Sequence, residues 1–534
     1  MVTISKSKLF AMAIILLVGS TGFYLGQVLA TPAPSRNTVI TPGSNSIDCT
    51  YVIYVDGTTT LARNLQGDNA FASAPGATSE VVIQNAINAL DAGRNWYEKV
   101  CLEGFFTVNL QTQSGLQIAI MLSSYTILQI DGTLKLVNSA ASSAVQENFM
   151  IRVTDNQNNV VITGGEVDGN FLNQNQAEAN EVYGVEMGNS RDIWVENMYV
   201  HDTGETGIAV EGISYNVFIT NNHERNSQED GIGNQFTSHD VFYTANRIEN
   251  NQGSPGTGLT IEGGYNIVAT ANIVQNCTNG IKVARGTTTA PIRVSINGNQ
   301  AINNTSNGIF LINSVANVAV TGNLVFGTSL DGIIIGEGSG GKTGNVTVTG
   351  NTVLDSDMCC GSGHSGILVA ALASGVVISS NVCSDNRGTP TQDYGIAVLA
   401  GANNLDIIGN SCRGNRVSGI LVQAPPGTAL TIHNNVGYDP VGKITNFIQG
   451  TFLGVCGTGT TVVSATIYVI CGTDVILTCT GGTVTAIVEK DNLGNQIFSV
   501  ANCAALPTTG LLIPQGYSIT WTHTGAPTVS VYGN

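Results

Sequence analysis

A glycine followed by an apolar residue recurs through the middle of the chain, and this repeat limits the fold more than any other feature. The glycines are separated by 22 to 34 residues, and most begin a short apolar segment such as Gly366-Ile367-Leu368-Val369. A repeat of roughly 20 to 50 residues is typical of solenoids, whose units pack only against their neighbours. Because these units contain short alternating apolar segments, we predict that each is one coil of a parallel β-helix. The repeated glycines are Gly207, Gly231, Gly258, Gly280, Gly308, Gly332, Gly366, Gly395 and Gly419.

A column of asparagines supports the same repeat. In successive units a short apolar segment ends in Asn, as in the segment from Asn345 to Asn351. Stacked Asn side chains hydrogen-bond to one another in cross-β ladders. We therefore predict a buried Asn ladder along the solenoid, with surface loops wherever a unit contains extra residues. The predicted ladder contains Asn197, Asn222, Asn246, Asn272, Asn299, Asn323, Asn351, Asn381, Asn410 and Asn435.

Three other segments resemble the right-handed parallel β-helices of the pectate-lyase-like (pectin lyase fold) superfamily. Residues 164–170, Gly-Gly-Glu-Val-Asp-Gly-Asn, are similar to a turn of that superfamily, and residues 51–57 and 81–90 are similar to its first segments. The resemblance covers about residues 50 to 440 and implies a right-handed β-helix. It selects no activity, because this fold carries lyases, hydrolases, epimerases and adhesins.

The composition and charge narrow the partners. Only 11 % of the 534 residues are charged, 64 are glycine, and the net charge is −17. A negative surface repels phosphate backbones, so we expect no nucleic-acid partner. It also disfavours polyanionic glycans unless Ca²⁺ bridges carboxylates on both sides. We expect a neutral polysaccharide or cell-surface glycan as the partner and no cofactor, with Ca²⁺ as the open alternative.

The first thirty residues have the pattern of a targeting segment. Lys6 and Lys8 precede an uncharged run at 9–30, which ends in the small-residue pattern Val28-Leu29-Ala30. The run is also long enough to span a bilayer. Residues 1–30 are therefore a cleaved signal peptide or an N-terminal membrane anchor, and residues 31–48 are a linker. Either alternative predicts that the protein is secreted or lies on the cell surface.

The remaining chain divides into a β-helix and a smaller C-terminal domain. Apolar residues at helical spacing in residues 79–91 predict an amphipathic helix that caps the first coil. The β-helix is predicted for residues 49–440. After about residue 455 the repeat stops, and short strands with turn signals predict an antiparallel β-sandwich over 455–534. The predicted fold class is all-β.

The cysteines fit an oxidising compartment, where disulfides persist. The chain has 11 of them, without a CxxC pair or a Cys/His spacing that indicates zinc. Cys383 and Cys412 occupy the same place in adjacent units. We interpret them as stacked core thiols, with a disulfide as the alternative.

The strands led by the repeated glycines should form one long parallel sheet, and its outward side chains can be arranged in rows across the strands. Outward residues in one row lie about 4.8 Å apart. Charged residues are concentrated here and in the preceding turns, which contain His201, Asp202, Glu205, Glu229 and Asp230. The first predicted row is Glu186, Ala209, Gly233, Thr260 and Lys282, and the second is Gly188, Glu211, Gln235, Glu262 and Ala284.

These rows suggest a catalytic site formed by Glu211, Asp230 and Glu262. Glu211 and Glu262 should lie two coils apart, about 9–10 Å between Cα atoms, and inverting glycosidases hold their carboxyls roughly 6.5–9.5 Å apart. We therefore predict a glycoside hydrolase first and a polysaccharide lyase second. The alternative of another class is a non-catalytic adhesin or envelope protein, because any exposed sheet must present polar groups. The predicted substrate-binding residues are Glu186, Gln235, Thr260, Lys282 and Arg285.

A second, weaker candidate site contains Asp331, His364 and Asp393. These residues occupy nearly equivalent turns of three consecutive units, where a His between two Asp could transfer protons or bind a metal. The neighbouring outward row is apolar, which disfavours sugar binding. Separately, Glu224 occupies a core-facing place after Asn222, so it is either a paired buried carboxylate or a sign that the register shifts by one residue.

Overall fold

The computed structural model describes residues 48–436 except for short gaps, and the strands of residues 460–533. The gaps are 114, 142–146, 176–180, 287–289, 339–340, 360–362, 424–428 and 434. The predicted signal peptide or anchor at 1–30 lies outside the described residues. Among the residues that are described, no helix is both long and apolar enough to cross a bilayer.

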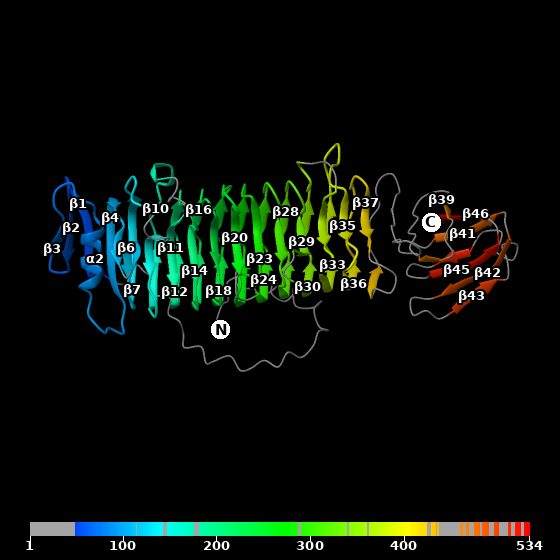
Figure 1. The fold of residues 1–534 in the computed structure, drawn as a ribbon, viewed down its shortest axis with the longest axis horizontal. Helices are drawn as coiled ribbons and strands as arrows, with labels where there is room; N and C mark the ends of the chain where they lie inside the picture. The colour runs from blue at the N-terminus through cyan, green and yellow to red at the C-terminus, as the bar shows by residue number, and fades with distance from the viewer. Residues whose placement is uncertain are drawn as a thin grey trace, which may run out of the picture. The chain divides into compact units, whose positions relative to one another are not determined.

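Successive coils of the chain stack into a long solenoid, which confirms the predicted right-handed parallel β-helix (Figure 1). Strand β14 (Ile208–Glu211) pairs in parallel with β17 (Asp230–Asn234), β17 with β20 (Thr257–Glu262), and β20 with β23 (Asn279–Ala284). These strands belong to a sheet of 13 strands, and a second sheet contains 25 strands. The core lies between them and contains the inward residues of every coil, such as Ile232.

The other strands of the 13-stranded sheet are β5 (Gln111–Gln113), β6 (Leu116–Leu122), β8 (Asn148–Val153), β11 (Val182–Gly188), β26 (Ile309–Ile312), β29 (Ile333–Glu337), β32 (Ser365–Val369), β35 (Tyr394–Val398) and β37 (Ser418–Val422). The 25-stranded sheet contains β1 (Tyr51–Asp56), β2 (Thr59–Asn64), β3 (Asn69–Ala72), β4 (Glu98–Val108), β7 (Thr126–Leu136), β9 (Asn158–Thr163), β10 (Glu166–Asp168), β12 (Arg191–Glu196), β13 (Tyr199–His201), β15 (Tyr215–Thr220), β16 (His223–Arg225), β18 (His239–Thr244), β19 (Arg247–Glu249), β21 (Tyr265–Thr270), β22 (Ile273–Gln275), β24 (Ile292–Asn297), β25 (Gln300–Ile302), β27 (Ala316–Thr321), β28 (Leu324–Phe326), β30 (Thr343–Thr349), β31 (Thr352–Leu354), β33 (Ala373–Ser379), β34 (Val382–Ser384), β36 (Asn403–Ile408) and β38 (Leu430–His433).

Close packing between coils explains the repeated glycines. A Cβ atom at Gly258 would lie 2.1 Å from Cγ1 of Val274, and one at Gly332 would lie 2.3 Å from Cγ1 of Val353. Both distances are far below van der Waals contact, so any larger residue would push adjacent coils apart. The repeated glycine therefore marks the position in each coil where the backbone packs most closely against neighbouring residues.

The Asn ladder is present from Asn222 onward. Each side-chain amide donates to the side-chain oxygen of the next member at 2.8–3.0 Å, and the members are 0 to 4 % exposed. The prediction for Asn197 is wrong. Met198 occupies the ladder position, since its N–H donates to Oδ1 of Asn222, whereas Asn197 takes the left-handed turn position before it, with φ of 58°.

The predicted helix segment forms α2 (Glu80–Asn88), beside the first coils. Its apolar face is buried in the same core as those coils. Gln84 ties it to β6, because its side chain donates to the carbonyl of Met121 at 3.1 Å and accepts from the N–H of Met121 at 2.8 Å. The buried helix residues are Glu80, Val82, Ile83, Ala86 and Ile87.

The C-terminal strands form two antiparallel sheets of four strands each. Packing of these two sheets into a sandwich stays a prediction. The first sheet contains β39 (Thr460–Val462), β41 (Val475–Thr480), β44 (Leu511–Ile513) and β46 (Thr528–Gly533), and the second contains β40 (Thr466–Tyr468), β42 (Thr483–Lys490), β43 (Gln496–Val500) and β45 (Ser518–Thr524).

Two pairs of cysteines in the β-helix behave differently. Cys49 and Cys101 form a disulfide, with their Cα atoms 5.8 Å apart. Cys383 and Cys412 are free and buried on neighbouring coils, which confirms their interpretation as stacked core thiols.

Candidate functional site

The strand register places the predicted outward row on five consecutive strands. Glu186 lies beside Ala209, Ala209 beside Gly233, Gly233 beside Thr260, and Thr260 beside Lys282. Arg152 on β8, which the sequence analysis did not select, extends the row beyond Glu186. In the second row, Gly188 lies beside Glu211 and Glu262 beside Ala284.

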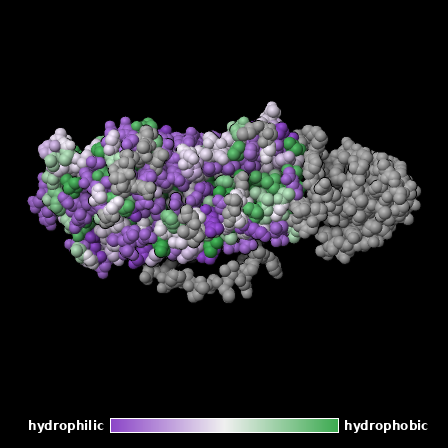
Figure 2. Space-filling model, viewed as in Figure 1, coloured by the Kyte–Doolittle hydropathy of each residue, from purple (hydrophilic) through white to green (hydrophobic). Residues whose placement is uncertain are grey.

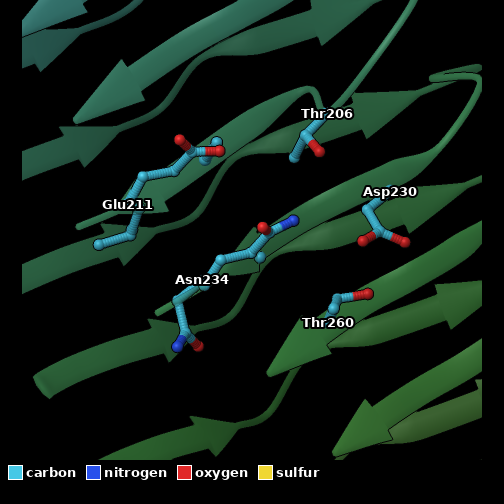
Figure 3. A pocket seen from close by; sticks show the side chains of 9 residues that line it. Thr206, Glu211, Asp230, Asn234 and Thr260 are labelled. Carbon is cyan, nitrogen blue, oxygen red and sulfur yellow. The ribbon is translucent and has the colours of Figure 1, made fainter. Parts of the chain in front are cut away.

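A small hollow lies over the middle of the first row, between β14, β17 and β20 (Figure 3). Its free space is about 10 Å³, roughly enough for one water molecule. Small residues create it: a Cβ atom at Gly233 would lie 2.9 Å from the carbonyl oxygen of Thr260 and would fill the space. The hollow is lined by Thr206, Ala209, Val210, Glu211, Asp230, Gly233, Asn234, Gln235 and Thr260.

Asp230 is the buried acid of this hollow. It is 4 % exposed, and its Oδ1 has no hydrogen-bond partner among the described residues. Burial raises the pKa of Asp230 to about 7, a rise that Lys282 and the Thr260 hydroxyl reduce and that the carboxyls of Glu229 and Glu262 reinforce. An acid with this pKa can gain or lose a proton near neutral pH.

Glu211 is the second acid of the hollow and reaches it from the neighbouring strand (Figure 3). Burial, followed by the charge of Glu147, raises the pKa of Glu211 to about 7, while Arg152 and a hydrogen bond from Tyr183 lower it. Tyr183 is held in place by stacking on Phe149, with ring centroids 5.1 Å apart. The sequence did not point to Tyr183, although this residue lies near the start of β11, the strand that carries the predicted site residue Glu186.

Only two of the other predicted site residues line the hollow with Glu211 and Asp230. Glu262 forms an ion pair with Lys282 and does not line the hollow. Glu186 is 1 % exposed and pairs with Arg152 at 2.9 Å, so little of it is accessible to a ligand. Gln235 and Thr260 do line the hollow, whereas Arg285 is exposed and outside its lining.

Two further acids lie in the turns before β14 and β17. Burial, followed by hydrogen bonding and charge repulsion from the nearby carboxyl of Glu229, raises the pKa of Glu205 to about 10. The charge of Glu229 favours the protonated form of Glu205. The charge of Glu229 also contributes to the raised pKa of Asp230.

Glu224 faces the core, so the predicted register does not shift at this coil. Its backbone pairs with Val200 and Ile248 of the adjacent coils. Its carboxyl accepts hydrogen bonds from Ser227 at 2.5 Å and from Asn251 at 2.7 Å, not from His223. Burial raises the pKa of Glu224 to about 8, so it is a neutral, hydrogen-bonded acid below that pH.

The second candidate site forms two separate pairs. His364 hydrogen-bonds through Nδ1 to Oδ2 of Asp331 at 2.9 Å. Asp393 instead pairs with Arg416 at 2.5 Å and accepts the N–H of Gly363 at 2.7 Å. The acids are therefore occupied by structural bonds.

A group that could hold a metal ion lies on the other sheet. Ligand atoms of Asp168, His201 and Asp202 all lie within 4.8 Å of one another. However, both ring nitrogens of His201 already bond to carboxylates, at 2.8 Å to Glu166 and at 2.7 Å to Asp202, and Asp168 pairs with Lys135. The histidine is thus an ion-pair centre in this structure.

Comparison with known proteins supports the fold. The family model described as "Right handed beta helix region" matches residues 137–295, and no curated protein matches the sequence. The A-module of the mannuronan C-5 epimerase AlgE6 of Azotobacter vinelandii is 18 % identical, with a TM-score of 0.56 over 67 % of this chain and 95 % of that one.

Two tailspikes are also similar in structure. The Dettilon tailspike is 16 % identical, with a TM-score of 0.52 over 85 % of this chain and 92 % of that one. The tailspike of the E. coli bacteriophage HK620, solved with a pentasaccharide, is 12 % identical, with a TM-score of 0.50 over 88 % and 91 %. At these identities the likeness establishes the fold alone.

Proposed function

Because this chain is a right-handed parallel β-helix of the pectate-lyase-like fold, we propose that it acts on polysaccharide and that the hollow at Glu211 and Asp230 is a glycoside-hydrolysing site. One observation carries the proposal. Two carboxyls on adjacent strands line a single hollow on the outward side of the 13-stranded sheet, and the pKa of each is raised to about 7. Perturbed acids in a hollow are typical of functional sites.

The two acids suit different roles. Asp230 is the more buried, and its unpaired Oδ1 lies in a hollow with room for about one water molecule. It would accept a proton from that water. Glu211, at the rim beside Tyr183, would donate a proton to the glycosidic oxygen. Attack by a water held in this way predicts inversion at the anomeric carbon.

The ion pair of Lys282 favours hydrolysis over elimination. A lyase needs a cation to neutralise the sugar carboxylate while a base removes the neighbouring proton. Lys282 is already paired with Glu262. The hollow thus offers acids and hydroxyls, which is the set that hydrolysis requires.

A non-catalytic glycan-binding protein is the second candidate, and the size of the hollow favours it. The space is about 10 Å³, far below the roughly 300–1,000 Å³ of typical ligand pockets. A sugar chain would then lie along the sheet face and be held without cleavage.

An assay on a panel of polysaccharides tests the proposal. New reducing ends should appear with at least one glycan, and Glu211→Gln or Asp230→Asn should abolish them. The matched control is Glu103→Gln, which makes the same chemical change on the exposed face of β4. Unsaturated products would identify a lyase instead, and binding without products would identify the non-catalytic alternative.

The proposed location is outside the cytoplasm. The disulfide between Cys49 and Cys101 supports an oxidising compartment. Secretion and membrane anchoring through residues 9–30 both remain predictions, because that segment lies outside the described residues.

A further inference from the structure

The hollow of the proposed site lies between two contacts of a cation with an acid. Ala209 and Gly233 form the floor, on adjacent strands. Beyond Ala209, the outward row continues to Glu186 and Arg152, and beyond Gly233 it continues to Thr260 and Lys282. Three strand spacings of about 4.8 Å each separate Glu186 from Thr260, which leaves a width comparable to one sugar ring above the floor.

The cation on each side of the hollow already contacts an acidic side chain. On one side, Nε of Arg152 lies 2.9 Å from Oε2 of Glu186, and the guanidinium stacks over Phe149 at 4.3 Å from the ring centroid. On the other side, Nζ of Lys282 pairs with Oε1 of Glu262. Side-chain exposure of the four paired residues is only 1 to 21 %. Burial raises the pKa of Glu186 well above its usual range, so this acid holds Arg152 partly as a neutral contact, whereas Glu262 pairs with Lys282. An anionic sugar would have to displace one of these mostly buried acids to reach either cation.

The groups that face the hollow are acids, amides and hydroxyls. Oδ1 of Asp230 is buried without a hydrogen-bond partner among the described residues, and the Thr260 hydroxyl lies close enough to the Asp230 carboxyl to lower its pKa. Glu211 and Gln235 complete the rim. Sugar hydroxyls both donate and accept hydrogen bonds, so they would satisfy these atoms, whereas a sugar carboxylate can only accept.

From this arrangement we infer that the sugar bound over Ala209 and Gly233 is uncharged, and that a uronate is rejected there. This inference takes from the proposed function only the location of the sugar-binding site at the hollow. A carboxylate on the sugar would lie near Glu211 and Asp230 in a partly buried setting, where like charges repel strongly. The repulsion should grow as both acids lose their protons.

Paired probes test this inference. Oligogalacturonate, oligomannuronate and oligoglucuronate are each compared with the same oligomer after reduction of its carboxyls to hydroxymethyl groups. Binding to the full chain is measured by calorimetry at pH 6 and pH 8. At least one reduced oligomer should bind at both pH values, and its acidic form should bind roughly tenfold or more weakly at pH 8.

Variants assign the discrimination to the hollow. The double variant Glu211→Gln with Asp230→Asn should improve binding of the acidic oligomer at pH 8 by roughly tenfold. Gln235→Lys, which adds a cation at the rim, should do the same while both acids are kept. Glu103→Gln should leave the preference unchanged. Circular dichroism with a thermal melt verifies that each variant is folded.

The outcomes separate this inference from the proposed function. A reduced oligomer that binds without being cleaved supports the inference and contradicts hydrolysis. An acidic oligomer that is cleaved, or that binds as tightly as its reduced form at pH 8, overturns the inference and leaves hydrolysis standing. Failure of every probe to bind overturns both.

Discussion

The tripeptide Asp-Gly-Ile occurs twice at the start of a strand in the 13-stranded sheet, at Asp230 in β17 and at Asp331 before β29. Both aspartates are 4 % exposed. Asp331 accepts the N–H of Ser365 at 2.6 Å and bonds to His364 at 2.9 Å. Oδ1 of Asp230 has no hydrogen-bond partner among the described residues. The same local sequence thus gives an acid with both oxygens hydrogen-bonded in one coil and an acid with an unpaired oxygen in another, and the adjacent coil makes the difference.

The surroundings differ in the same way. The outward row near Asp230 is polar, whereas the row near Asp331 continues from Phe310 through Ile334 to Leu368. Figure 2 shows hydrophobic residues gathered over the later coils and mainly hydrophilic residues over the earlier ones. The inward residues repeat because they build the solenoid, while the outward residues vary freely and can carry a function.

The largest expected difference between the two aspartates is in activity. Asp230→Asn should lower turnover of a cleaved glycan by roughly two or more powers of ten, the scale for losing a general acid or base. Asp331→Asn should leave turnover within about twofold, because a structural acid contributes nothing to proton transfer. Initial rates of reducing-end release measure both. Equal losses in the two variants would remove the distinction.

Replacing an asparagine of the buried ladder should instead destabilise the protein equally in both regions. Asn272→Ala, under the earlier coils, and Asn351→Ala, under the later ones, each remove four hydrogen bonds of the ladder. Each should lower the free energy of unfolding by about 1–3 kcal/mol. Chemical denaturation checks this, with exposed Asn69→Ala as the control. Unchanged stability in either variant would show that its amide is not part of a buried ladder.

For stability we expect the reverse of the order for activity: Asp331→Asn should destabilise the fold more than Asp230→Asn. Asp331→Asn weakens bonds to His364 and Ser365, so it should cost about 1.5–3 kcal/mol at neutral pH. Asp230→Asn removes a poorly compensated buried charge, so the unfolding free energy should stay the same or rise. Denaturation at pH 7.5 compares them. A larger loss for Asp230→Asn would mean that this acid is structural.

The pH dependence should separate the two sites more finely. In the folded protein the pKa of Asp230 is raised from 3.8 to about 7. The folded state therefore binds a proton more tightly than the unfolded state, and this stabilises the fold at low pH. The stabilisation is lost as pH rises from about 4 to 7, at no more than about 1.4 kcal/mol per pH unit. Asp331 raises the pKa of His364 above 6.5, so that contribution is lost only at higher pH.

Unfolding free energies of wild type and variants across pH 4 to 9 resolve these windows. The difference between wild type and Asp230→Asn should change mainly below pH 7, and the difference for Asp331→Asn mainly above pH 6.5. Identical profiles for the two variants would contradict the assignment.

The sequence predicted the coils and the outward rows correctly because packing repeats every coil. Its one ladder error, Asn197, arose because the coil has two adjacent turn positions that both favour Asn: a left-handed residue and the ladder residue. The ion pairs could not be predicted. Whether Lys282 binds Glu262 or a ligand depends on side-chain directions in neighbouring coils, which periodicity does not determine.

The most direct test of the account is a crystal structure of the Asp230→Asn variant with an uncharged oligosaccharide that the wild-type protein cleaves. We expect a sugar ring over Ala209 and Gly233, with a glycosidic oxygen within hydrogen-bond distance of Glu211. A sugar bound elsewhere, such as beside His364 or on the other sheet, would contradict it.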